Sequence, residues 1–206
     1  MLSFVAAPES IPALLVDPKS RVTSPVGVCI GLTVSERQGF PYLGERLESL
    51  LYDDETVLSL YNVLEYARSC SGLDSREYSL DIDKSSHQYC LNNTLYISGA
   101  SLTLSYLYGL ILLSKNIPWP ESTFVTGSIC KKKQDWHCES VGLFKSKLRL
   151  AAEFGYHRFF VPQANLRDIN PSLYDTSRLL PMPKSLPSCL NLWAEYTNYP
   201  CDNFSK

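Results

Sequence analysis

The sequence lacks several features that would assign it to a common functional class. It contains no G-x-x-x-x-G-K-[ST] phosphate-binding loop, so nothing in it indicates nucleotide hydrolysis. An excess of positive charge is also missing, because 19 Lys and Arg residues stand against 21 Asp and Glu residues, giving a net charge of −2. A chain without a positive field is not expected to attract nucleic acid. The one basic run, Lys131-Lys132-Lys133, is interpreted as a solvated loop.

Histidine is scarce, and the motifs that organise histidine and metal chemistry are missing. The chain has three histidines, His87, His137 and His157, and neither G-x-S-x-G nor C-x-x-C occurs. A Ser-His-Asp site would need a carboxylate to place one of these histidines, and no nucleophile motif accompanies any of them. Cys130, His137 and Cys138, even with His87 or Cys90 added, fit no standard zinc spacing. The sequence therefore predicts neither a metal nor another cofactor.

A hydrophobic run long enough to span a membrane is not found either. Between Lys84 and Lys115 there is no charged residue, but the densest apolar part, residues 97–113, is only 17 residues long. A membrane-spanning helix needs about 20 mainly apolar residues, and this segment also contains three serines. We interpret it as a helix buried on all sides inside a domain and expect no membrane association.

The cysteine pattern and the first residues indicate an intracellular protein. Seven cysteines are an odd number with irregular spacing, unlike the even sets of disulfide-stapled secreted domains. Residues 1–16 make a poor signal peptide, because they lack a basic start, carry Glu9 and are interrupted by Pro8 and Pro12. We expect mostly buried, reduced thiols and a cytoplasmic location.

Proline and glycine punctuation together with hydrophobic periodicity divides the 206 residues into an N-terminal arm, residues 1–25, and one domain, residues 26–206. The periodicity predicts strands and helices in alternation. The strands are expected at 26–34, 78–83, 122–129 and 157–161, and the helices at 53–70, 102–113, 145–154 and 188–196. This order favours an α+β fold with a mixed β-sheet flanked by helices.

A serine stands in a turn directly before the buried helix, in the run Gly99-Ala100-Ser101. A hydroxyl at this place lies at the positive end of a helix, beside backbone N–H groups that can stabilise an oxyanion. Taken alone, the serine is better explained as a helix N-cap. Lys147, on a later amphipathic helix, is by itself better explained as a lysine whose amine reaches solvent.

The order of motifs around this serine resembles the proteolytic domain of the Lon protease family. That family has its nucleophile in D-G-P-S-A-G before a long apolar helix, followed by T-G-E-[IV], G-G-[LI]-K-E-K-L-x-A-A and an apolar strand ending in Pro. The matching segments here are Gly99–Ser101, Thr126–Ile129, Gly142–Leu148 and Phe159–Pro162, preceded by a V-G-x-V-x-G-L-A-like strand at Val26–Thr33. The resemblance covers about residues 26–196, most of the chain.

The spacing within these motifs matches individual residues of this chain to functional positions of the family. Ser101 and Thr126 are 25 residues apart, as in the family, and counting back from Pro162 puts Lys147 at the family's catalytic lysine. The resemblance therefore implies a catalytic dyad of Ser101 and Lys147, in which the lysine is a neutral general base. It also implies a threonine hydroxyl, that of Thr126, beside the lysine amine.

Other implications concern the turn and the missing motor domain. Gly99 and Ala100 are expected to support the serine, although Ser98 and Ala100 replace the family's acidic residue and proline. The loop between Ile129 and Gly142 is about three residues longer than in the family. The AAA+ motor is absent, as it is in the birnavirus polyprotein proteases, which the chain also resembles through this Ser-Lys arrangement.

Two functions follow from these implications. The first is an ATP-independent serine endopeptidase that uses the Ser-Lys dyad to cleave unfolded, loop or partner protein segments. The second is a catalytically inactive Lon-like domain used for binding or assembly, because a fold does not determine a function. A protein or peptide is the expected substrate, and the sequence leaves open an oligomer or a regulating partner protein.

Overall fold

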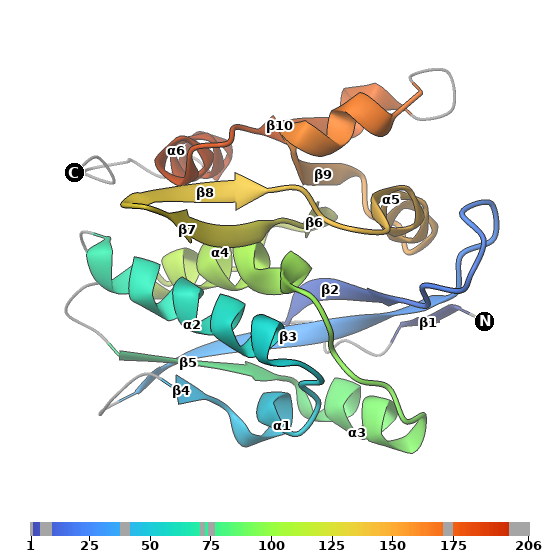
Figure 1. Ribbon diagram of the computed structural model, residues 1–206, viewed down its shortest axis with the longest axis horizontal. Helices are drawn as coiled ribbons and strands as arrows, with labels where there is room; N and C mark the ends of the chain where they lie inside the picture. Colours follow the sequence, from blue (N-terminus) through green and yellow to red (C-terminus); the bar gives the residue numbers. More distant parts are fainter. Residues whose placement is uncertain are drawn as a thin grey trace.

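The computed structural model describes residues 2–4, 10–37, 42–70, 73, 77–170 and 175–197. Its architecture is α+β, as the sequence predicts (Figure 1). In the described part of the chain the strands divide among three sheets instead of forming one. A five-stranded sheet lies on one side of the molecule, and a three-stranded sheet and a two-stranded hairpin lie on the other.

The five-stranded sheet is mixed and is organised around one long strand. Its strands are β1 (Leu2–Phe4), β2 (Ile11–Val16), β3 (Gly27–Arg37), β4 (Tyr42–Leu43) and β5 (Glu77–Ile82). The first half of β3 pairs antiparallel with β2, and its second half pairs antiparallel with β5, whereas β1 and β4 join in parallel. The strands expected at 26–34 and 78–83 are thereby confirmed.

The expectation that residues 1–25 form a separate arm is wrong, because β2 is an integral strand of this sheet. Each of its six residues pairs with β3, from Ile11 opposite Leu32 to Val16 opposite Gly27. Burial of its apolar side chains is the physical reason, as Ile11 and Leu14 are each only 6% exposed. In the described ranges β2 pairs with β3 alone, and such an edge strand tolerates a proline like Pro12.

Helices cover both faces of the five-stranded sheet. The short helices α1 (Glu45–Glu48) and α3 (Lys84–Asn92) lie on one face, and α2 (Asp54–Ser69) and α4 (Thr103–Ser114) lie on the other (Figure 1). The helix expected at 53–70 is confirmed together with its cap, because the Asp53 carboxylate accepts a hydrogen bond from the Thr56 N–H. The helix at 102–113 is confirmed as a buried one, since all residues from Thr103 to Leu112 are buried.

A second layer of structure lies beyond α2 and α4. It contains the parallel sheet of β6 (Thr123–Val125), β9 (Arg158–Pro162) and β10 (Leu179–Met182), and the hairpin of β7 (Ser128–Lys132) and β8 (Asp135–Glu139). It also contains helices α5 (Phe144–Glu153) and α6 (Leu186–Tyr196), both near their expected positions. Short 3-10 helices η1 (Ala100–Leu102), η2 (Gln163–Asp168) and η3 (Thr176–Arg178) complete the described elements.

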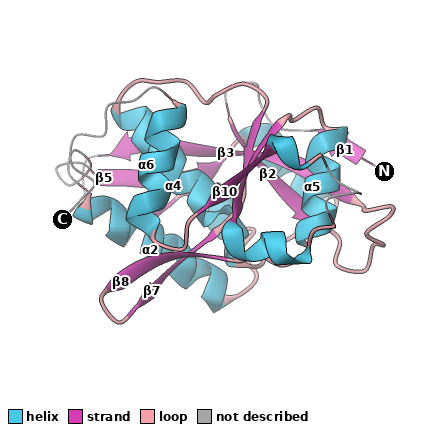
Figure 2. Cartoon of the chain, turned by 90° about the horizontal axis from the view of Figure 1, so that it is seen from above, coloured by secondary structure: helices cyan, strands magenta, loops and turns pink. Residues whose placement is uncertain are grey.

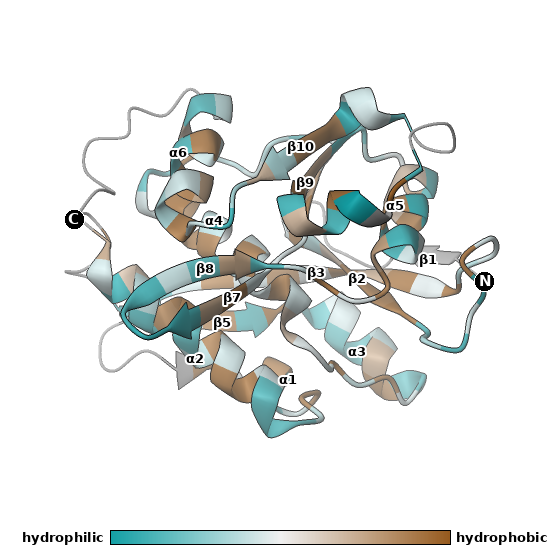
Figure 3. Cartoon of the chain, turned by 45° about the horizontal axis from the view of Figure 1, so that its top comes forward, coloured by the Kyte–Doolittle hydropathy of each residue, from teal (hydrophilic) through white to brown (hydrophobic). Residues whose placement is uncertain are grey.

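The strand expected at 122–129 is interrupted, and this interruption matters for the site. It divides into β6 and β7 at Thr126-Gly127. The Thr126 N–H still donates to the Phe160 carbonyl of β9 at 3.1 Å, but the next N–H, that of Gly127, donates to the Ser101 carbonyl instead of continuing the sheet. Gly127 also packs closely on α4, where an added Cβ would approach the Leu104 side chain to 2.8 Å. The hairpin that follows is hydrophilic toward its tip (Figure 3).

An aromatic cluster joins the two layers. The rings of Tyr108 on α4 and Trp193 on α6 stack with centroids 4.4 Å apart, and Phe160 on β9 packs edge-on against both. Figure 2 shows α4 and α6 next to one another at one end of the molecule, with α5 at the other end. Within the described ranges, no helix has the length and apolar character needed to cross a membrane.

The cysteines in the described ranges are all free thiols. Five are buried and one, Cys130, is half-buried, as the sequence analysis expected. Cys201 lies outside the described residues.

Candidate active site

Ser101 lies where a turn enters the buried helix, and the turn is anchored from both sides. Gly99 adopts a φ of +86°, a conformation that L residues rarely adopt, and its N–H donates to the Thr56 hydroxyl at 2.6 Å. That hydroxyl in turn donates to the Asp53 carboxylate at 2.7 Å. Ala100 then begins η1, which runs directly into α4. The start of α2 therefore holds the turn that presents the serine.

The other anchor of Ser101 is its own carbonyl group. It accepts hydrogen bonds from the Gly127 N–H at 3.0 Å and from the Thr126 hydroxyl at 3.2 Å. Thr103, two residues later, accepts the Ile129 N–H at 2.9 Å through its hydroxyl. The serine backbone is thus fixed to the break between β6 and β7, and its side chain is left to face a groove.

Lys147 approaches this serine from α5. The helix begins after Leu143, which has a left-handed conformation with a φ of 54°, and the Lys147 N–H donates to the Leu143 carbonyl at 2.9 Å. The lysine Nζ lies 2.5 Å from the Ser101 Oγ. The two residues are 46 positions apart in the chain, so the fold brings together the pair that the motif spacing singled out.

Burial sets the protonation of this lysine. The residue is 7% exposed, and removal of its ammonium from water lowers its pKa from 10.5 to about 8. A substantial fraction of the amine is then neutral at mildly alkaline pH, and a neutral amine has a lone pair that can accept the proton of a serine hydroxyl. The solvent-exposed alternative for Lys147 is excluded by its burial.

The dyad opens into a groove. This cavity of about 440 Å³ is bordered by β2, by the turn before η1 and by the segment that precedes α5. Its wall contains both apolar and polar side chains, and Tyr96 and Leu143 are large exposed side chains at its margin. Glu55 is the one acidic side chain among the described residues that line it.

Thr126 occupies a different role from the expected one. It is buried beside the dyad, but its hydroxyl donates to the backbone of Ser101 and not to the amine of Lys147. The reason is the break after β6, which turns Thr126 toward η1. Thr126 therefore positions the serine, and α5 carries the lysine.

Sequence reasoning missed two groups that hold the site together. The first is the link from Asp53 through Thr56 to Gly99, of which only the cap at Asp53 has a recognisable sequence signal. The second is Asn165, a buried side chain that both accepts from the Val141 N–H at 2.9 Å and donates to the Val141 carbonyl at 3.0 Å. Asn165 lies in η2, and nothing in the local pattern marks it.

Alternative catalytic groups are less well placed. His87 contacts the Ser49 hydroxyl at 3.0 Å on the exposed surface, and neither residue lines the groove. Across the described ranges, no group of three His, Cys, Asp or Glu residues is arranged to hold a metal ion.

Comparison with known proteins adds no family assignment. No protein-family model matches this chain, and no curated protein matches it.

Proposed function

We propose that this chain is an ATP-independent serine endopeptidase with a Ser101–Lys147 dyad in a Lon-like proteolytic domain. The observation that carries the proposal is the 2.5 Å contact between the Lys147 amine and the Ser101 hydroxyl. The buried lysine gives this contact its chemical meaning, because a serine hydroxyl needs a base to become a nucleophile.

Each step of peptide hydrolysis has a group that can perform it. The neutral Lys147 amine takes the proton of the Ser101 hydroxyl as its oxygen attacks the peptide carbonyl. The Ser101 N–H and a neighbouring N–H of the turn lie at the start of a helical segment, where N–H groups have no intrahelical acceptor, and they stabilise the oxyanion. The protonated lysine then gives its proton to the leaving amine, which leaves an acyl-enzyme.

Deacylation uses the same two residues in the same roles. Once the leaving peptide departs, Lys147 is neutral again and removes a proton from a water molecule that attacks the ester. Collapse of the second tetrahedral intermediate returns the proton from the lysine to the Ser101 oxygen. The enzyme ends in its starting state, and no nucleotide enters the cycle.

The substrate follows from the groove. An open groove accepts an extended segment, so loops, tails and unfolded chains fit. These 206 residues contain no phosphate-binding loop of a motor that would unfold a stable domain. We further propose that the protein works in the cytoplasm, does not bind nucleic acid or membranes, and has a protein or peptide as its substrate. An oligomer or a partner protein would then supply regulation.

The experiment is cleavage of unfolded casein by the full chain and by Ser101→Ala. We expect fragments from the wild type, none from Ser101→Ala, and the same rate with and without ATP. Undiminished cleavage by Ser101→Ala would contradict the dyad. A well-folded wild-type protein that cuts neither casein nor a peptide library would favour the inactive binding domain instead.

A further inference from the structure

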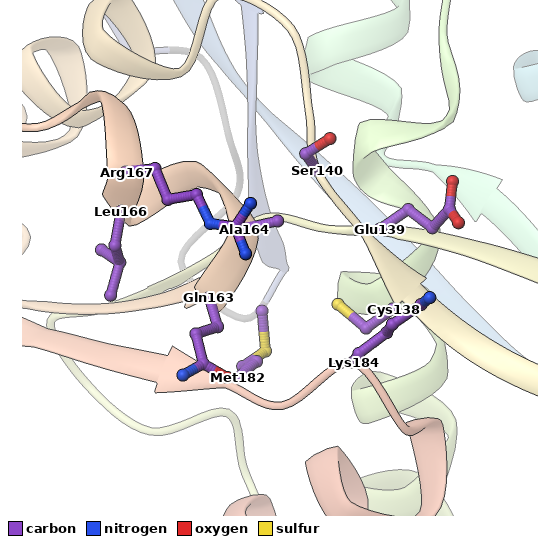
Figure 4. A pocket seen from close by; sticks show the side chains of 9 residues that line it. All are labelled: Cys138, Glu139, Ser140, Gln163, Ala164, Leu166, Arg167, Met182 and Lys184. Atoms are coloured by element: carbon purple, nitrogen blue, oxygen red, sulfur yellow. The ribbon is translucent and has the colours of Figure 1, made fainter.

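A second cavity adjoins the groove and has a different chemical character. It measures about 660 Å³ and is lined by the end of β8, by η2, by Met182 at the end of β10 and by Lys184 just after β10 (Figure 4). We call it the side pocket. Ser140 lines both cavities, and Glu139 of the side pocket pairs in register with Ser128 of the groove. Since paired strands lie about 4.8 Å apart, the side pocket begins one strand spacing from the groove.

The walls of the side pocket are held in place by backbone hydrogen bonds. The Cys138 N–H donates to the Lys184 carbonyl at 2.8 Å, which fixes the segment after β10 against β8. On the other side, the double hydrogen bond of Asn165 to Val141 fixes η2 against the wall of the groove. A peptide in the groove therefore meets a preformed side pocket.

The floor of the side pocket is apolar, and its charged walls are predominantly positive. Met182 and Cys138 are 1% and 4% exposed and form the floor. The Arg167 guanidinium reaches into the side pocket from η2, and Lys184 lines the opposite wall with its amine on the side of Glu139 (Figure 4). The carboxylate of Glu139 is also part of the lining, but it already bonds to Lys132. In the described part of the chain no ion pair engages Arg167. The hydrogen bond from Lys132 lowers the pKa of Glu139, and the nearby charge of Lys184 adds to this effect.

We propose that the side pocket binds a carboxylate of the peptide that occupies the groove. The proposal rests on the proposed function, because it makes the side pocket a specificity site of the peptidase. An apolar floor with two cations fits a short aliphatic chain that ends in a carboxylate, as in a Glu or Asp side chain or at a chain terminus. The chain as a whole carries a net charge of −2 and does not attract anions in general. A preference for a carboxylate would therefore come from the side pocket itself.

Peptide binding to Ser101→Ala tests this without requiring turnover. Three pools of fluorescent, C-terminally amidated ten-residue peptides carry one fixed Glu, Gln or Lys and uncharged residues elsewhere. A fourth pool has no Glu but a free C-terminal carboxylate. By fluorescence anisotropy, we expect the Glu pool or the free-carboxylate pool to bind about tenfold more tightly than the Gln pool. The tighter of these two pools identifies the source of the carboxylate.

A charge-reversal variant localises the effect to the side pocket. In Arg167→Glu/Lys184→Glu, built on Ser101→Ala, we expect the preference for a carboxylate to disappear and the Lys pool to bind best. Both side chains are exposed, so the fold should tolerate the change. The matched control is Lys133→Glu on the hairpin tip, which does not line the side pocket and should leave the order of the pools unchanged.

The outcomes separate this inference from the proposed function. Equal binding of all four pools, or a carboxylate preference that survives the charge reversal, overturns the side-pocket proposal even if casein is cleaved. Conversely, a carboxylate preference that the reversal removes upholds the side pocket even if no cleavage occurs, and the proposed function alone then fails.

Discussion

Two lysines of this chain show how environment decides what the same side chain can do. Lys147 on α5 is 7% exposed, and burial lowers its pKa to about 8. Lys132 on β7 is exposed and bonds to the Glu139 carboxylate, which raises its pKa. One amine is prepared to accept a proton, and the other is held as a cation. The comparison teaches that the site depends on the absence of water around an amine as much as on the amine itself.

Among replacements of these two lysines, the largest expected effect is the loss of activity when Lys147 is replaced. Lys147→Ala should lower kcat/KM by about 10³-fold or more, because the base that activates Ser101 is lost. Lys147→Arg should lose as much, since a guanidinium stays protonated and cannot accept a proton.

The controls for this prediction use two other lysines. Lys132→Arg and Lys145→Ala should retain activity within about twofold, as neither side chain lines the groove. Peptide cleavage rates check all four variants. Full activity in Lys147→Arg would show that a neutral amine is not required.

The next largest effect is on the free energy of unfolding. Replacing Lys147 should raise it, although the same replacement lowers activity. A pKa that falls from 10.5 to about 8 on folding means that the unfolded chain binds the proton more tightly than the folded one. Below about pH 8 this destabilises the fold by roughly 3 kcal/mol, and the cost fades as the pH rises toward 10.5. Lys147→Met should therefore gain about 1–3 kcal/mol at pH 7 while losing activity.

Urea unfolding at pH 7 and pH 10 measures this gain. We expect it to be present at pH 7 and largely lost at pH 10. Lys132→Met, the exposed counterpart, should show no comparable gain at either pH. A Lys147→Met variant that is less stable than the wild type at pH 7 would indicate that the ammonium is well accommodated.

The smallest expected effect is on the stability of two variants that lose an uncharged amide, one buried and one exposed. Asn165→Ala removes two hydrogen bonds and leaves the Val141 peptide group without them, at a cost of about 2 kcal/mol. The exposed amide of Gln88 makes one hydrogen bond, to Asn92 at 2.9 Å, and Gln88→Ala should cost less than about 0.5 kcal/mol. Thermal unfolding compares the two, and equal losses would show that Asn165 does not clamp the groove wall.

The sequence predicted elements whose signals are local. The amphipathic pattern and Asp53 cap located α2, and the uncharged apolar run located α4 as a fully buried helix. The prediction failed where the signal is not local. Ile11–Val16 forms a strand because it pairs with β3, and Pro12 within it is a residue typical of loops. The break at Thr126-Gly127 likewise depends on a distant acceptor, the Ser101 carbonyl.

The candidate site divides in the same way. Ser101 and Lys147 were found because ordered motifs keep a fixed spacing, although no local pattern shows that 46 residues of chain close into a contact. The resemblance implied a neutral Lys147, and the burial that lowers its pKa arises from packing that no local pattern shows. The positions of Asn165 and of Thr56 depend on packing between elements, so a single sequence gives no signal for either.

The pH dependence of kcat/KM on one peptide, from pH 5 to pH 10, tests the central claim most directly. That profile reports the ionisation of the base in the free enzyme. The rate should rise with a single ionisation near pH 8, the value to which burial lowers the Lys147 pKa. A limb near pH 6.5 that disappears when His87, His137 or His157 is replaced would instead show that a histidine, and not Lys147, activates the nucleophile.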